Sequence, residues 1–186
     1  MKVLIFIDHD IVLRHFIDSG VLKPLMDAHD TLFYFPIQDY KKRQRVSRDI
    51  YALGLGGKVR HLKVNLERDR MCAKLNHVNN LRWRPGRHYS IMRYRALDSI
   101  GPGHAREYRF LSLPCVYQFF LYRTKRRLAQ SLNADLEEVL DGEKPDVLLH
   151  PTVMYGPFIN DLAEAGKRRG IPLIAIMNSW DNPSSK

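Results

Sequence analysis

Residues 145–177 read PDVLLHPTVMYGPFINDLAEAGKRRGIPLIAIM, and this stretch decides the fold. It begins with a short apolar run at 146–149 and continues into residues 156–169, whose apolar side chains recur at helical spacing. Gly170 then ends the helix, and a second apolar run follows at 172–177. Strand, helix and strand within about 30 residues form a βαβ unit, which requires parallel pairing with a right-handed crossover.

The same alternation is present at the start of the chain. Apolar runs at 2–7 and 31–35 are separated by helical segments, and a weaker run at 59–64 lacks a clean apolar face. Together these runs predict an α/β fold with a Rossmann-like parallel sheet and helices on both faces. A length of 186 residues is ordinary for one domain, so we expect a single domain over 1–186.

The middle of the chain has a helical pattern. We predict a basic helix at 39–53, helices at 69–81 and 89–99, and one long helix at 114–141. Gly142 stands where a glycine commonly ends a helix, directly after the long one.

Composition excludes several classes of protein. Cys72 and Cys115 offer neither a disulfide framework nor a metal-binding spacing, and two reduced thiols are typical of a cytosolic protein. No apolar run reaches the about 18 residues that a membrane-spanning helix needs. The first apolar run, 3–7, is too short for a signal peptide. We therefore predict a cytoplasmic protein without a metal site.

The positive charge is regional. The net charge is +10, but residues 41–95 hold 16 Lys or Arg and only three acids, while the remainder holds 14 and 17. Such a local excess indicates an anionic partner, such as a nucleic acid, an anionic membrane surface or a phosphate-bearing acceptor. A solvated helix face is the alternative. The residues that we expect to bind an anionic surface share one face of the predicted basic helix: Lys41, Lys42, Arg43 and Arg45.

Glycine-rich phosphate loops are absent after the predicted strands. The first strand leads into Asp8-His9-Asp10, which is not a dinucleotide-binding turn. Gly54–Lys58 resembles a phosphate loop, but it lacks the upstream glycine and the hydroxyl residue that should follow the lysine. We interpret this segment as a helix stop and predict no bound cofactor.

Polar loops follow three of the predicted strands instead. Because parallel strands end at one edge of a sheet, these loops should converge on one cleft. A histidine oriented by a carboxylate is a suitable general base there, and acids flank His9, so His9, Asp8 and Asp10 are our catalytic candidates. The expected substrate-binding residues of the other two loops are His150, Thr152, Tyr155, Asn178, Ser179, Trp180, Asp181 and Asn182.

The last of these loops carries a resemblance to a known family. Residues 178–186, NSWDNPSSK, are similar to the S-W-D-N-x-[ST]-[ST]-K segment of bacterial glycosyltransferase-like proteins of surface polysaccharide synthesis. The opening run 2–7, with Arg14, His15 and Phe16 after it, and the run at 145–149 also look like the amino-terminal domain of those proteins. They have the two-domain GT-B architecture.

The resemblance implies a function. In GT-B enzymes the amino-terminal domain mainly binds the acceptor, and a carboxy-terminal domain binds the nucleotide-sugar donor. Asp8, His9 and Asp10 would lie near the acceptor hydroxyl, in a protein peripheral to the inner membrane that acts on a glycan or lipid-linked acceptor. The cleft floor would be lined by residues of the terminal segment: Trp180, Asp181, Asn182, Ser184, Ser185 and Lys186.

The end of the sequence fits the same interpretation. The chain stops just after a strand-end loop, so we expect the first half of a larger transferase, inactive as an isolated chain. Two alternatives remain open. One is a non-catalytic basic α/β module that binds nucleic acid or anionic lipid, and the other is half of a glycerol-phosphate transferase or a sugar epimerase.

Overall fold

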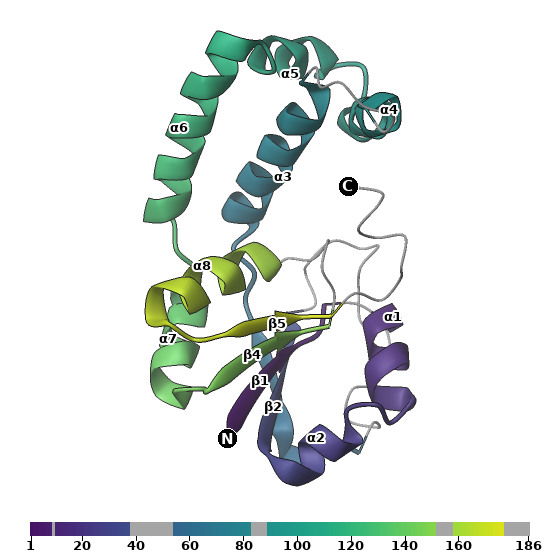
Figure 1. Ribbon diagram of the computed structural model, residues 1–186, viewed down its shortest axis with the longest axis vertical. Coiled ribbons are helices and arrows are strands. Elements are labelled where there is room, and N and C mark those ends of the chain that lie inside the picture. The colour runs from purple at the N-terminus through teal and green to yellow at the C-terminus, as the bar shows by residue number, and fades with distance from the viewer. Residues whose placement is uncertain (9, 38–53, 83–88, 152–157, 177–186) are drawn as a thin grey trace. The chain divides into compact units, whose positions relative to one another are not determined.

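The computed structural model describes residues 1–8, 10–37, 54–82, 89–151 and 158–176. The chain divides into two compact units (Figure 1). The first, here called the α/β unit, consists of residues 1–65 and 133–182. The second comprises residues 66–132 and 183–186, and its continuous segment 66–132, which interrupts the first unit, is here called the helical unit.

The described residues of the α/β unit form one five-stranded sheet, and all the strand pairs in it are parallel. The strand order is β3-β2-β1-β4-β5. This confirms the predicted Rossmann-like α/β fold and the four strands expected from apolar runs, and β3 confirms the weaker one. The strands are β1 (Lys2–Phe6), β2 (Asp30–Pro36), β3 (Val59–Leu62), β4 (Val147–His150) and β5 (Leu173–Ala175).

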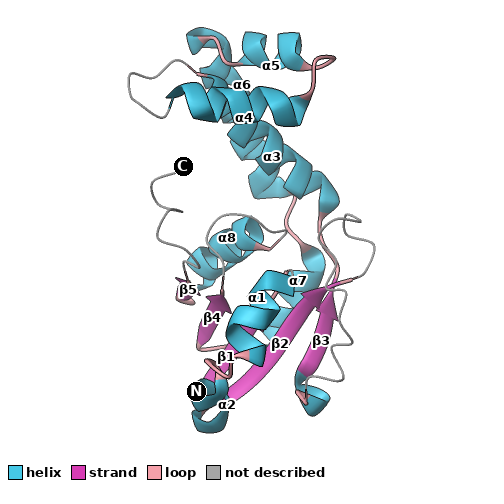
Figure 2. Ribbon diagram, turned by 90° about the vertical axis from the view of Figure 1, so that its right-hand side faces the viewer, coloured by secondary structure: helices cyan, strands magenta, loops and turns pink. Residues whose placement is uncertain are grey.

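Helices cover both faces of the sheet (Figures 1 and 2). Side chains alternate between the two faces along β1, because successive residues of a strand point to opposite sides. Val3, Ile5 and Ile7 pack against the segment that holds α1 (Asp10–Leu13), a π-helical turn and α2 (Lys23–Ala28). Leu4 and Phe6 pack against α7 (Ala134–Glu143) and α8 (Ile159–Arg169). A central strand with two buried faces explains the continuous apolar run at the start of the chain.

The predicted helix at 114–141 is wrong, because it is two helices. The helix α6 (Pro114–Gln130) ends before Ser131, and α7 begins at Ala134. Asn133 has an extended backbone, with ψ 99°, and its side-chain oxygen accepts a hydrogen bond from the backbone N–H of Leu136. An asparagine in this conformation is a favourable N-cap, so it starts a new helix where the apolar periodicity continues without interruption.

The described residues of the helical unit form four helices. The predicted helices at 69–81 and 89–99 are confirmed as α3 (Leu66–Leu81) and α4 (Tyr89–Ile100), and α5 (Ala105–Leu111) was not predicted. Within this unit α3 and α6 lie side by side, and α5 precedes α6 along the chain (Figure 1). No helix within the described ranges is both long and apolar enough to cross a membrane.

Candidate active site at the carboxyl edge of the sheet

The strand order creates a switch point between β1 and β4. From β1 the chain proceeds outward through β2 to β3, and it later returns to the other side of β1 as β4 and β5. The connections on the two sides therefore diverge, and ligands of open α/β sheets bind in the crevice at the carboxyl ends of such strands. Asp8 lies two residues beyond β1, and His150 is the last residue of β4.

Asp8 and His150 come together at this point. The Nε2 atom of His150 lies 3.4 Å from the Oδ2 atom of Asp8, and the two side chains are 0% and 1% exposed. Both continue the face of the sheet on which Phe6 and Leu148 pack against α7 and α8. The backbone of His150 is fixed as well, because its carbonyl accepts a hydrogen bond of 3.2 Å from the N–H of Ile176.

This pair has the chemistry of an acid–base element. A carboxylate beside an imidazole orients the ring and stabilises the cation that forms when the ring takes a proton. Burial strengthens this interaction, since charges attract more strongly where water is excluded. Charged or polar groups that are fully buried at a strand end are also costly for stability, so their presence there favours a functional role over a structural one.

Most of the other predicted site residues lie outside the described residues. Asp10 is the first residue of α1. The structure brings together Asp8 and His150 and describes none of the following: His9, Thr152, Tyr155, Asn178, Ser179, Trp180, Asp181, Asn182, Ser184, Ser185 and Lys186. The predicted basic helix, with Lys41, Lys42, Arg43 and Arg45, is also outside the described ranges.

The glycine-rich segment leads into a strand. Gly56–Lys58 forms a short 3-10 turn that leads into the beginning of β3. It therefore lies at the amino end of a strand, whereas phosphate loops connect the carboxyl end of a strand to a helix.

A second buried polar cluster was missed by the sequence analysis. The side-chain amide of Asn133 donates to the carbonyl of Lys63, at 3.1 Å, and to Oδ2 of Asp161, at 3.3 Å. Asp161 lies in the first turn of α8, where a carboxylate is stabilised by the helix dipole. Lys63 directly follows β3, so this cluster also belongs to the carboxyl edge of the sheet. The one available signal was the helix-capping preference of Asn133.

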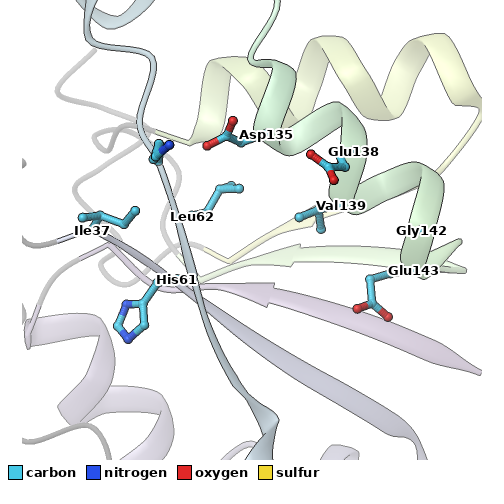
Figure 3. A pocket seen from close by; sticks show the side chains of 9 residues that line it. Ile37, His61, Leu62, Asp135, Glu138, Val139, Gly142 and Glu143 are labelled. Atoms are coloured by element: carbon cyan, nitrogen blue, oxygen red, sulfur yellow. The ribbon is translucent and has the colours of Figure 1, made fainter.

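A groove of about 360 Å³ runs between the edge strand β3 and α7 (Figure 3). The carboxylates of Asp135 and Glu138 lie at its rim, and Leu62 and Val139 form an apolar floor. His61 projects from the other side of β3, where its ring lies 6.4 Å from that of Phe35. The groove is two strands away from β1, so it is separate from the Asp8–His150 pair. Across the described parts of the chain, no group of three or more His, Cys, Asp or Glu residues could hold a metal ion.

No protein-family model, curated protein or solved structure matches this chain, so no relative assigns a role to these residues.

Proposed function

We propose that this chain is the acceptor-binding half of a nucleotide-sugar-dependent glycosyltransferase of GT-B architecture that acts in surface glycan synthesis. Its partner in this proposal is a carboxy-terminal domain that binds the nucleotide sugar. The sequence similarity of residues 178–186 to a segment of such proteins supports it, as does the Rossmann-like sheet that every GT-B domain requires.

The observation that carries the proposal is the buried Asp8–His150 pair at the switch point. A sugar hydroxyl is a weak nucleophile at neutral pH, and a positioned base contributes about 10²–10⁴-fold to its reaction. In the proposed step His150 takes the hydroxyl proton of the acceptor, while the acceptor oxygen forms a bond to the anomeric carbon of the donor. The bond to the nucleoside diphosphate breaks, and that group leaves with the electron pair. Asp8 acts as a positioning residue that holds the imidazole.

The test uses the full-length enzyme and a panel of nucleotide sugars, with release of nucleoside diphosphate as the signal. Asp8→Asn and His150→Gln should each lower kcat by about 10²–10⁴-fold. Thermal melts check that both variants fold. A pH–rate profile separates a chemical role from a structural one, because loss of a base removes the limb of the profile that it controls.

Two comparisons sharpen the test. Asp10→Asn, at the first residue of α1, and His9→Ala test the two other catalytic candidates of the sequence. Near-normal turnover of both Asp8→Asn and His150→Gln would eliminate the pair as an acid–base element. Transfer by the isolated 186-residue chain would contradict the division of labour between two domains.

A non-catalytic binding module is the second candidate. It is favoured by the distribution of charge, because residues 66–132 hold 14 Lys or Arg and four acids, whereas the rest of the chain holds 16 of each. A full-length protein that binds anionic ligands but turns over no nucleotide sugar would support this candidate.

A further inference from the structure

The entire net charge of the protein is located in the helical unit. Residues 66–132 carry +10 and the remainder is neutral, so the charge follows the division into two units. A net charge of this size on one structural unit indicates a binding surface for an anionic partner rather than a general aid to solubility.

Within this unit, α6 has one face that packs and one that does not. Tyr117 and Thr124 are buried, and α3 contacts this side of the helix. The guanidinium of Arg82, which follows α3, lies 3.9 Å from the centre of the Tyr117 ring. The buried Arg68 of α3 donates a hydrogen bond to the carbonyl of Leu128. These contacts fix which side of α6 faces the interior of the unit.

The opposite side of α6 presents apolar and cationic side chains to solvent. Cys115, Phe119, Tyr122 and Arg126 recur at spacings of four, three and four residues, so they form one stripe along the helix. Phe119 is 63% exposed and Tyr122 is 62% exposed, which is unusual for two neighbouring aromatic side chains. Arg123 lies beside them, 5.7 Å from the centre of the Phe119 ring. We call these five residues the α6 stripe.

More exposed apolar side chains immediately precede the stripe in the chain. Phe110 of α5 is 60% exposed, and Leu113, at the start of α6, is 49% exposed. No other described element of the helical unit covers the outward side of α6 (Figure 1). Single exposed apolar residues are normal on a protein surface, but two exposed aromatic residues on one helix face, with cations alongside and two more exposed apolar residues just before them in the chain, mark a candidate interaction site.

We propose that the α6 stripe docks on the surface of a bilayer that contains anionic lipid. The cations would contact the headgroups, and Phe119 and Tyr122 would enter the boundary between headgroups and acyl chains. This occupant fits the chemistry best, because exposed aromatic side chains on one helix face, with arginines beside them and an exposed leucine just before the helix, are suited to interfacial binding. Nucleic acid would use the arginines and the rings but would gain little from Leu113. The proposal does not depend on catalysis, and it concerns a different surface from Lys41–Arg45.

The experiment measures binding of the full chain to vesicles of phosphatidylcholine with and without phosphatidylglycerol. Binding should require the anionic lipid and should weaken with salt, because exposed charges are screened over about 10 Å at 0.1 M. Phe119→Ser with Tyr122→Ser should lower the affinity by about tenfold or more, through loss of apolar insertion. Arg123→Ser with Arg126→Ser should lower it by about fivefold for each cation removed.

A matched control separates the stripe from overall charge. Lys23→Ser with Lys167→Ser removes two exposed cations from the neutral α/β unit and changes the net charge equally. This control should bind almost as the wild type does. Equal losses in the two charge variants would show that total charge, not the α6 stripe, determines binding, and would overturn the proposal.

Cys115 provides a direct readout of insertion. It is exposed on the stripe while Cys72 is buried, so a polarity-sensitive thiol dye should label Cys115 selectively. The dye emission should shift to the blue when anionic vesicles are added, and Cys115→Ser is the unlabelled control. An unshifted emission, equal binding to neutral vesicles, or tighter binding to a labelled oligonucleotide than to anionic vesicles at physiological salt would each contradict bilayer docking.

Discussion

The two units of this protein are stabilised in different ways. The α/β unit contains all twelve of the largest fully buried side chains in the described residues, and both apolar core clusters belong to it. The described part of the helical unit buries far less, with Val78 and Ala96 as its most completely covered apolar residues. The α/β unit therefore has a core of packed apolar layers, and the described part of the helical unit buries only a few apolar side chains.

Polar contacts connect the helices of the second unit. Arg68 donates to a carbonyl of α6, and the hydroxyl of Tyr117 donates to Oδ1 of Asn79 at 3.3 Å. Lys74 and Glu107 pair at 2.5 Å between α3 and α5. Surface ion pairs and single hydrogen bonds contribute little each, so we expect the helical unit to open more readily than the α/β unit. A unit with few buried apolar groups also retains exposed ones, which are available to a partner.

The largest expected effect compares one phenylalanine from each unit. Phe6 is fully buried, stacks on Tyr34 with ring centres 5.2 Å apart and contacts the Phe158 ring edge-on at 5.6 Å. Phe6→Ala should cost about 3–5 kcal/mol of unfolding free energy, because it leaves a cavity in a packed core. The control Phe119→Ala, on the exposed side of α6, should change stability by less than about 0.5 kcal/mol. Urea midpoints measure both, and similar losses would remove the distinction between the units.

A smaller loss of stability is expected from a change at Asn133, the residue at which the chain re-enters the α/β unit. Asn133→Ala removes the cap of α7 and the hydrogen bonds to Lys63 and Asp161, and it should cost about 2 kcal/mol. Asn133→Asp keeps an acceptor for the cap but loses the donor and places a carboxylate next to Asp161. Comparing the two variants separates the contribution of the cap from that of the hydrogen bonds that the Asn133 amide donates. If Asn133→Asp is as stable as the wild type, only the cap matters.

The smallest predicted effect is a pH dependence of the helical unit. Burial lowers the pKa of His77 below its ordinary value of 6.5. Below pH 6.5 the unfolded chain then binds this proton more readily than the folded one. The free energy of unfolding is therefore unaffected by His77 above that pH, and it decreases as the pH falls from 6.5 toward the folded pKa. The change should stay below the about 1.4 kcal/mol per pH unit that one group can give. His77→Leu should flatten this slope in denaturant titrations at neutral and mildly acidic pH, and an unchanged slope would assign the effect to other groups.

The parts of the fold that could be predicted are those in which burial is continuous along the chain. Runs such as 2–7 are apolar on both sides because the strand is covered on both faces, whereas only Leu62 of the four residues of β3 is buried, and this strand gives a weak pattern. The break at Asn133 was hidden because helical periodicity continues through it, and only the cap geometry reveals it. The limits of the helical unit, at residues 66 and 132, could not be predicted from the sequence, because its helices lack the strong apolar face that would mark a separate core.

The site was predictable to the same extent. Parallel strands bring their carboxyl ends together, so polar residues after β1 and β4 could be expected at one edge, and Asp8 and His150 meet there. The contact of Asn133 with Asp161 joins residues 28 apart in sequence through packing of α7 and α8, which no local pattern records.

The hydrogen bond between Asn133 and Lys63 has a consequence for protein engineering. The side-chain nitrogen of Asn133 lies 3.1 Å from the carbonyl oxygen of Lys63, and these two residues flank the segment 66–132. Both ends of the inserted segment therefore start from one place. A few glycine and serine residues can bridge such a gap at little entropic cost. The helices can therefore be treated as a detachable cassette: removed to leave a minimal α/β fold with no net charge, or replaced by another hairpin to give the same scaffold a new surface.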